Sequence, residues 1–430
     1  MAFKIGLLGY GTVGTGTAEI ILDPTDRNHL LQEIEIARVG VRSPDKPRSP
    51  ELASGVLTTD LSAIVTDPEI DIVVELLGGL EPSRSLILKA IDHGKHIVTA
   101  NKAVIARHGE EIFTAANKAG VYVLLEGTVG GGIPVIKPLK QSLGVNRIQT
   151  VIGIINGTTN YILTQMTQEG ADFGSVLAEA QKLGYAEADP TADVDGYDAA
   201  DKIAILAAIA FNGRIKRVDI PCEGIRQVTA TDISYADDLG FVIKLLAIAK
   251  ANANHDSLQV RVHPTLVPKD HPLANVNGVY NAILVEGEPL GQVMFFGPGA
   301  GKGATASAVV SDIANIVAIL QTSNTREKLD PLLRCPHEHF KQLTPITDIT
   351  SRFYARFLCQ DVSGVIGHLG TSFGNHNVSL ESVVQIGFRN DLAEIVVVTH
   401  DVQEGNFRQA LEEIKSLESI NSIPSVLRVL

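Results

Sequence analysis

Two lysines stand out in the sequence because their neighbours would allow an ammonium group to take part in catalysis. Lys102 ends the segment Thr99-Ala100-Asn101-Lys102, which directly follows a predicted strand. Lys202 lies four residues after Asp198 at the start of a predicted helix, so the two side chains share one helix face. A carboxylate placed there can orient an ammonium and keep it protonated, as a general acid requires. The alternatives are a solvated lysine at position 102 and an ordinary ion pair at the helix start.

Lys202 closes a segment that is crowded with carboxylates. The segment begins at Gly184 and includes Glu187, Asp193 and Asp198. A cluster of this kind beside a lysine favours a polar cleft that holds the ammonium in place. An acidic first turn of a helix is the alternative explanation, because the helix dipole favours negative charge there.

A glycine-rich turn near the N-terminus has the spacing of a phosphate-binding loop. The residues Gly9-Tyr10-Gly11-Thr12-Val13-Gly14 follow a predicted strand and precede a predicted helix. Gly9 permits a tight turn, Gly11 lets the backbone approach a pyrophosphate, and Gly14 allows close helix packing. Thr12 and Val13 open the helix, whose N-terminus favours anions. The pattern predicts a dinucleotide-binding loop, and a glycine turn without a ligand is the alternative.

The end of the second predicted strand indicates which dinucleotide binds. An NAD-selective site usually has an acidic residue there for the ribose 2′-hydroxyl. This chain instead has Arg42, with Lys46 and Arg48 close behind. Arg42 is placed to bind a 2′-phosphate, which favours NADP while leaving NAD possible. A solvated basic loop is the alternative interpretation.

The elements that must position these residues begin with five short apolar runs, rich in Val and Ile, that barely alternate in polarity. Such runs suit strands that are covered on both faces. Because helical patterns separate them, they predict an α/β fold with a Rossmann-type, doubly wound parallel sheet. A helix over 82–93 has Pro82 in its first turn and Gly94 just past its end. The expected strands are 3–8, 34–41, 70–77, 96–99 and 121–126.

The rest of the chain divides into segments with different sequence patterns. After the dinucleotide-binding domain over 1–130, we expect an α+β domain over 131–325 that binds the substrate. Its helical patterns lie near 133–143, 158–168, 175–183 and 197–211, and its strands lie near 258–267 and 280–285. Its helix near 300–320 is expected to return to the first domain. The charged, proline-containing stretch 326–350 is expected to be a linker. Strands and helices over 351–430 follow a βαββαβ order.

Composition and charge exclude several classes of protein. The 430 residues carry a formal net charge of −13 and no long basic block, so no nucleic acid is expected as a partner. The separated Cys222, Cys335 and Cys359 argue against disulfides and zinc, which favours a reducing cytoplasm. We expect neither a signal peptide nor a transmembrane segment, because the apolar runs near 203–211 and 241–249 are too short.

These motifs and their order along the chain resemble those of homoserine dehydrogenases over about residues 1–320. The most distinctive similarities are the stretches 126–134 (EGTVGGGIP) and 184–202. The resemblance implies that Lys202 and Lys102 act at the reacting carbonyl and that Gly184 lines the same pocket. It also implies that Glu187, Asp193 and Asp198 hold the amino-acid substrate, whose ammonium group suits carboxylates.

The same resemblance implies a sodium ion held mainly by main-chain carbonyl groups. The matching positions in this chain are Glu126, Val129, Gly131 and Ile133. Hard oxygen ligands suit such a cation. From the residues alone, a glycine hinge between domains is an equally good interpretation.

The C-terminal module resembles an ACT domain, a small regulatory fold that pairs with copies of itself and binds amino acids. The similarity rests on the turn Asp361-x-x-Gly364-Val365-Ile366-Gly367. It implies effector sites near Gly364, Val365, Ile366 and Asn377, with threonine as the effector. It also implies a homodimer or homotetramer.

The resemblance therefore implies reversible, NAD(P)H-dependent reduction of L-aspartate 4-semialdehyde to L-homoserine, a step in threonine, methionine and isoleucine biosynthesis. One alternative is another amino-acid or hydroxy-acid dehydrogenase, because the fold alone does not separate these activities. A second alternative is a sensor of nucleotides or amino acids without enzyme activity.

Overall fold

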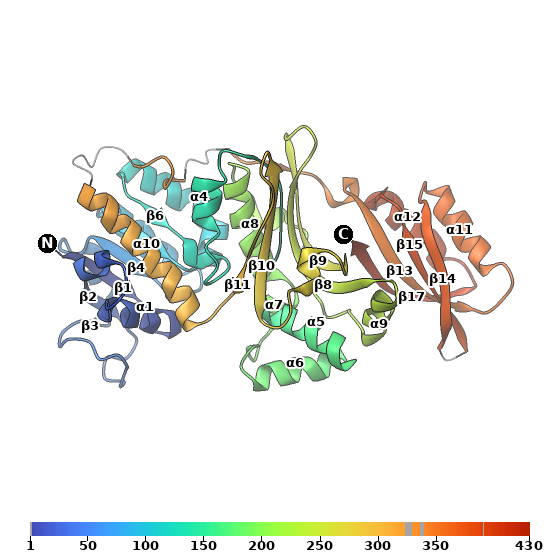
Figure 1. The fold of residues 1–430 in the computed structure, drawn as a ribbon, viewed down its shortest axis with the longest axis horizontal. Helices are drawn as coiled ribbons and strands as arrows, with labels where there is room; N and C mark the ends of the chain where they lie inside the picture. Colours follow the sequence, from blue (N-terminus) through green and yellow to red (C-terminus); the bar gives the residue numbers. More distant parts are fainter. Residues whose placement is uncertain (1, 323–328, 336–338, 390) are drawn as a thin grey trace. The chain divides into compact units, whose positions relative to one another are not determined.

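A computed structural model describes residues 2–322, 329–335, 339–389 and 391–430 (Figure 1). The chain forms two compact units. Unit 1 consists of Met1–Val151, Asp201–Asp219 and Tyr280–Lys341, and unit 2 consists of Ile152–Ala200, Ile220–Val279 and Gln342–Leu430. The chain crosses between the units within strand β7 (Arg147–Ile154) and helix α8 (Tyr197–Ala210). Part of the expected linker, residues 326–328 and 336–338, lies outside the described residues.

Unit 1 contains a six-stranded sheet in the order β3-β2-β1-β4-β5-β6, in which every neighbouring pair is parallel. The order reverses direction between β1 and β4, which is the doubly wound arrangement. The predicted Rossmann-type fold is thus confirmed. The strands are β1 (Phe3–Leu8), β2 (Ile34–Gly40), β3 (Leu57–Thr58), β4 (Ile72–Glu75), β5 (His96–Thr99) and β6 (Val123–Leu124).

Helices join the strands of this sheet. One further helix, α10, comes from late in the chain. Gly16 of α1 lies so close to α10 that an added Cβ would be 2.9 Å from the carbonyl oxygen of Lys302. The late segment therefore completes the core of the N-terminal sheet. The helices are α1 (Thr12–Leu22), α2 (Leu61–Thr66), α3 (Ser83–Asp92), α4 (Lys102–Ala119) and α10 (Lys302–Thr322), and a 3-10 turn, η1, covers His29–Glu33.

Helix α10 is long and apolar enough to cross a membrane by length and composition alone. Its residues Val309, Ile313, Ile316 and Val317 are buried in the core that also contains β1 and β4. A core helix of a globular domain passes the same test of length and composition.

The remaining elements of unit 1 extend it beyond the sheet. Strand β10 pairs antiparallel with β11 and neighbours β7. The helix expected over 133–143 is shorter than predicted, because regular helix begins only at 136 and continues as a π-helical turn, η3 (Pro138–Ser142). The other elements are η2 (Glu126–Thr128), β10 (Tyr280–Glu288), β11 (Gly291–Pro298), the later part of α8 and η4 (Arg217–Asp219).

Unit 2 begins with a helical layer and an antiparallel strand pair, β8 and β9. Strand β8 covers a short apolar run. Periodicity alone does not decide whether such a run forms a strand or a helix, because it suits a buried strand or a buried helix equally well. These elements are α5 (Gly157–Glu169), α6 (Phe173–Lys182), α7 (Thr191–Val194), α9 (Ala230–Asp238), β8 (Phe241–Ala251), β9 (Ser257–Pro268) and η5 (Pro272–Asn275).

The C-terminal part of unit 2 has the predicted βαββαβ order. Its strands run β17-β13-β15-β14, and β17 also pairs in parallel with β9, which makes one continuous sheet in this unit. Stacked Phe353 and Phe407 rings, with centroids 4.1 Å apart, lie in its core. The elements are β12 (Gln342–Leu343), η6 (Ile346–Asp348), β13 (Thr350–Gln360), α11 (Val365–Asn375), β14 (Leu380–Arg389), β15 (Leu392–Thr399), β16 (Val402–Gln403), α12 (Glu404–Lys415) and β17 (Ile420–Val429).

Candidate active site

The first turn of α5 brings the predicted carboxylates together in unit 2. Asn156 caps this helix, since its Oδ1 accepts a hydrogen bond of 2.8 Å from the Thr159 amide. Its buried Nδ2 donates to Asp193 at 2.7 Å and to Asp198 at 3.0 Å. One side chain thus fixes two carboxylates from different segments. Asn156 was not among the predicted site residues, although an Asn before a helical pattern is a recognisable N-cap signal.

The loop that carries Glu187 is attached to the same turn. The Thr158 hydroxyl donates to the Tyr185 carbonyl oxygen at 2.8 Å, and Gln181 donates to the Glu187 carbonyl oxygen at 2.9 Å. Gly184 starts the loop with a φ of +79°, a conformation that favours glycine. The Glu187 backbone is therefore held while its side chain stays exposed to solvent.

The two predicted lysines stand near the starts of two helices that are joined within unit 1. Lys102 is the first residue of α4, and Lys202 lies one turn after Asp198 on α8, largely buried. Arg107 of α4 donates to Asp201 of α8 at 2.8 Å, and Arg217 donates to the other oxygen of Asp201 at 2.7 Å. The buried Asp201 carboxylate thus ties together the helices that carry both lysines.

A buried glutamate orders the segment before Lys102. Glu75, at the end of β4, accepts hydrogen bonds from the hydroxyls of Ser83 at 2.9 Å and Thr99 at 2.8 Å. Asn101 caps α4 and donates to the Gly79 carbonyl oxygen at 2.8 Å. These bonds fix Lys102 at the carboxyl edge of the parallel sheet, which is where ligands bind in such folds. Glu75 was not among the predicted site residues.

The glycine loop has the geometry that a pyrophosphate requires. Gly9 has a φ of +105°, and a Cβ on Gly14 would lie 2.3 Å from the Gly9 carbonyl oxygen. Gly11 faces open space, with no atom within 4 Å of an added Cβ. Helix α1 begins at Thr12 without a side-chain cap, so its first amide groups are available to an anion.

The arginines of the basic loop after β2 have two different roles. Arg42 follows the end of the strand and is exposed. Arg48 instead donates to the carbonyl oxygens of Ser43 and Lys46, both at 2.7 Å, and so folds the loop onto itself. Arg42 is therefore the residue of this loop whose guanidinium is exposed at the end of the strand.

The side chain of Glu126 has a structural role that the sequence analysis did not anticipate. Its buried carboxylate accepts hydrogen bonds from the amides of Val135 at 2.7 Å and of Ile136 and Lys137 at 2.9 Å. It thereby caps the short helix that starts at 136. Its own amide donates to Asp312 at 2.8 Å. Burial raises the pKa of Asp312 to about 6, although Lys137 at 3.1 Å opposes that shift.

The turn that follows Glu126 presents main-chain oxygens. Gly131 has a φ of +54°, and a Cβ there would lie 2.6 Å from the Gly299 backbone. Within the described ranges, no hydrogen bond reaches the main-chain oxygens of Val129, Gly131 or Ile133. Neither amide atom of the buried Asn281, which contacts Gly299, has a partner there. Unpartnered buried polar atoms beside free carbonyl oxygens fit a hydrated hard cation.

The residues implied for the effector site lie around α11. Gly364 precedes this helix with a φ of +95°, and Asn377 follows it with a φ of +58°. Val365 is buried, whereas Ile366 is 49% exposed. In the part of the chain that the structure describes, no group of three His, Cys, Asp or Glu side chains is arranged to hold a metal ion.

A doubly wound parallel sheet with a glycine loop at its edge is the arrangement of an NAD-binding domain, and it is followed along the chain by helix α8, which carries Asp198 and the buried Lys202. These features define an oxidoreductase with an NAD-binding domain. Family models match the NAD-binding domain of homoserine dehydrogenase at 9–126, homoserine dehydrogenase at 134–314 and the ACT domain at 353–419. The chain belongs to the homoserine dehydrogenase family.

Two known relatives match this chain over its whole length, and a third matches three quarters of it. Homoserine dehydrogenase of a Synechocystis strain is 70% identical over 432 residues, with 100% of both chains covered. The solved enzyme of Thiobacillus denitrificans has a TM-score of 0.93 at 40% identity, covering 100% of this chain and 98% of that one. A hyperthermophilic archaeal homoserine dehydrogenase in complex with NADPH has a TM-score of 0.62 at 27% identity, covering 75% of this chain and 99% of that one.

These comparisons confirm the predicted family, the C-terminal ACT domain and the homoserine dehydrogenase function. The other two interpretations, a different dehydrogenase and a sensor without enzyme activity, are therefore set aside. The ACT domain indicates regulation by a small molecule.

Proposed function

We propose that this homoserine dehydrogenase uses NADP(H) in preference to NAD(H), with Lys202 as the proton donor and Lys102 polarising the same substrate oxygen. The observation that best supports the two lysine roles is the Arg107–Asp201 ion pair, because it joins the helices on which both lysines stand. Lys202 immediately follows Asp201, and Lys102 lies just over one turn before Arg107.

The proposed chemistry requires charge to be neutralised at one oxygen. The nicotinamide cofactor, when bound, delivers hydride to L-aspartate 4-semialdehyde or accepts it from L-homoserine. Negative charge develops on the aldehyde oxygen during reduction, so two ammonium groups near that oxygen stabilise the transition state. Lys202 gives a proton to the oxygen in this direction and takes it back during oxidation.

The carboxylates bind the other end of the substrate. Glu187 and Asp193 bind its α-ammonium group through charge-assisted hydrogen bonds. Asp198 holds the substrate with them and orients Lys202 from the preceding turn of α8, while Gly184 lines the same pocket. Asn156 supports these roles because it holds Asp193 and Asp198 together.

The cofactor roles follow from the backbone. Gly9, Gly11 and Gly14, with the amides at Thr12 and Val13, hold the pyrophosphate. Arg42 binds the 2′-phosphate, and its exposure at the strand end supports this role. The archaeal relative solved with NADPH points the same way.

Steady-state oxidation of homoserine with each cofactor tests the preference. We expect a higher kcat/KM with NADP than with NAD, and Arg42→Ala should lower the ratio by about tenfold, the loss of one strong ion contact. Arg38→Ala, an exposed arginine within β2, is the matched control and should leave the ratio unchanged. A wild-type enzyme that prefers NAD would refute the role of Arg42.

The main-chain oxygens of Glu126, Val129, Gly131 and Ile133 are the proposed ligands of a sodium ion. Such an ion would fix the turn between the dinucleotide-binding sheet and the elements that follow it. The free oxygens of this turn and the buried Asn281 support the site.

We also propose that threonine is the effector of the ACT domain, at Gly364, Val365, Ile366 and Asn377. Pairing through this domain would make the enzyme a homodimer or homotetramer. The edge position of β14, with Phe388 64% exposed, supports such pairing. Assays of homoserine oxidation with and without threonine test the regulation, and an unchanged rate at saturating threonine would refute it.

The proposed domain limits are 1–130, 131–325, a linker over 326–350, and 351–430. The matched family ranges 9–126, 134–314 and 353–419 fall within these limits and support them. A cytoplasmic location is supported by the three free thiols of Cys222, Cys335 and Cys359.

A further inference from the structure

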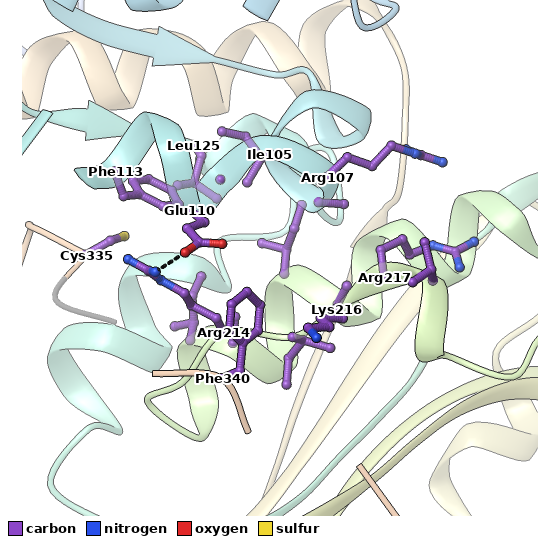
Figure 2. A pocket seen from close by; sticks show the side chains of 18 residues that line it. Ile105, Arg107, Glu110, Phe113, Leu125, Arg214, Lys216, Arg217, Cys335 and Phe340 are labelled. Carbon is purple, nitrogen blue, oxygen red and sulfur yellow. Dashed lines mark hydrogen bonds and ion pairs between the residues drawn. The ribbon is translucent and has the colours of Figure 1, made fainter. Parts of the chain in front are cut away.

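Unit 1 contains a cavity of about 260 Å³ between α4, α8 and the segment 214–218 (Figure 2). None of the residues proposed for the substrate, the cofactor or the sodium ion lines it. The cavity is smaller than the roughly 300–1,000 Å³ of a site for drug-sized ligands, so it suits a fragment-sized molecule.

The walls of the cavity are apolar. Helix α4 contributes Ile105 and Phe113, α8 contributes Ile205 and Ile209, and the next loop contributes Ile215. A ligand that enters must therefore present a hydrocarbon or aromatic body to these side chains.

The rim of the cavity carries an excess of positive charge. Arg107 and Arg217 share the single carboxylate of Asp201, and Arg214 pairs with Glu110 at 2.5 Å. The Lys216 ammonium lies 5.3 Å from the centre of the Phe340 ring. Among the described residues that line the cavity, Arg107, Arg214, Lys216 and Arg217 are cationic and Glu110 is acidic. In Figure 2 the labelled Lys216 lies between Arg214 and Arg217. The charge favours an anionic group on the ligand.

The mouth of the cavity exposes apolar surface. Val218 is 87% exposed and Phe340 is 45% exposed, and both line the cavity. A ligand that fills the mouth of the cavity would remove part of this apolar surface from water.

We propose that this cavity binds a small carboxylic acid with an aromatic or branched aliphatic body. Its carboxylate lies at the Lys216 side of the rim and its apolar body lies between α4 and α8. Occupancy fixes the spacing of these two helices, and because Lys102 and Lys202 stand on them, the acid changes the KM for homoserine. This regulatory consequence rests on the proposed roles of the two lysines, whereas the binding itself does not.

Calorimetric titration of the full-length enzyme with 3-phenylpropionate and its neutral amide, 3-phenylpropanamide, tests the binding without turnover. The two probes have the same body and differ in charge. We expect one acid per chain, with a Kd about tenfold lower than that of the amide, as one charge-assisted hydrogen bond provides. Equal affinity of the two probes, or no saturable binding of either, would overturn the proposal.

Two matched pairs of variants locate the site. Lys216→Gln should remove most of the tenfold preference for the acid, whereas Lys118→Gln, an exposed lysine at the other end of α4, should keep it. Ala208→Met fills the cavity and should abolish binding of both probes, whereas Ala210→Met lies on α8 outside the cavity and should not. An acid that binds Ala208→Met as it binds the wild type occupies another place, and the proposal fails.

Kinetics separate this site from the active site. With NADP saturating, 3-phenylpropionate should change the KM for homoserine up to a limit of about fivefold, the lower end of allosteric coupling. An effect that grows without limit as the acid increases indicates competition at the active site and contradicts the proposal. A normal Lys202→Ala rate would overturn the lysine roles instead, and the titration result would still stand.

Discussion

The cofactor loop and the acidic cluster at the start of α5 are built from different parts of the chain. In the loop the backbone itself forms the surface, and Gly9 and Gly14 are required because backbone atoms approach too closely for a Cβ. In the cluster, the buried amide of Asn156 holds carboxylates from segments about forty residues further along. A local backbone pattern is visible in the sequence, whereas a network of side chains depends on the completed fold.

The largest expected effect tests the side-chain region. Lys202→Ala should lower kcat by about 10²- to 10⁴-fold, the usual contribution of a general acid. The dissociation constant for NADP should hardly change, because the glycine loop does not involve this side chain. Stopped-flow turnover and a fluorescence titration of cofactor measure the two quantities. An unchanged kcat would remove Lys202 from its role.

The carboxylate under the Glu126 turn gives the next largest effect, on the pH dependence of stability. Because the folded pKa of Asp312 is raised from 3.8 to about 6, the folded state binds more protons than the unfolded state between these values. Its contribution to stability is therefore greatest in acid and declines as the pH rises through 6, by on the order of 2–3 kcal/mol.

Asp312→Asn should remove this decline, since an amide does not titrate and can still accept the Glu126 amide bond. Denaturant unfolding of both proteins between pH 4 and 7 measures it. The two stability curves should converge at low pH and separate toward neutral pH, with the variant less dependent on pH. Parallel curves would show that Asp312 has an ordinary pKa.

Two glycine variants sharpen the backbone side of the comparison. Gly11→Ala meets no atom within 4 Å, so the protein should keep its Tm while the Kd for NADP rises by about tenfold or more, because the methyl group occupies the pyrophosphate position. Gly14→Ala should lower the Tm and also raise the Kd for NADP, because its Cβ would meet the Gly9 carbonyl oxygen at 2.3 Å. If Gly11→Ala bound NADP as the wild type does, the loop would not carry the pyrophosphate.

The smallest expected effect comes from Asn156. Asn156→Ser keeps a residue that caps α5 but loses the two hydrogen bonds to Asp193 and Asp198, so the KM for homoserine should rise by about tenfold. The KM for NADP should not change. The control is Asn28→Ser, since Asn28 caps η1 and contacts no proposed substrate residue. Equal shifts in both KM values would mean a general loss of structure.

Much of the fold is predictable because its signals are local. The strands 3–8 and 96–99 match their predicted limits, and the βαββαβ order of the C-terminal module follows from alternating patterns. The expected strand 121–126 is reduced to Val123–Leu124, because the residues after it turn into the Glu126 segment. Boundaries of this kind depend on hydrogen bonds that periodicity does not record.

The supporting residues of the site were not predictable in the same way. Asp312 reaches Glu126 across 186 positions, and Arg107 reaches Asp201 across 94. Asp312 and Asp201 resemble ordinary helix-surface charges until the fold buries them, whereas Arg107 stays exposed. The lysines and carboxylates could be predicted because they share one segment or directly follow a strand. Their partners have no such local signal, so they were not predicted.

The central claim is that Lys102 and Lys202 act on one oxygen, and a double-mutant cycle in kcat/KM for homoserine tests it most directly. Groups that act as a unit are not additive, so Lys102→Ala combined with Lys202→Ala should be about as slow as the slower single variant. If the double variant instead shows the product of the two single effects, the lysines act independently and the claim is wrong.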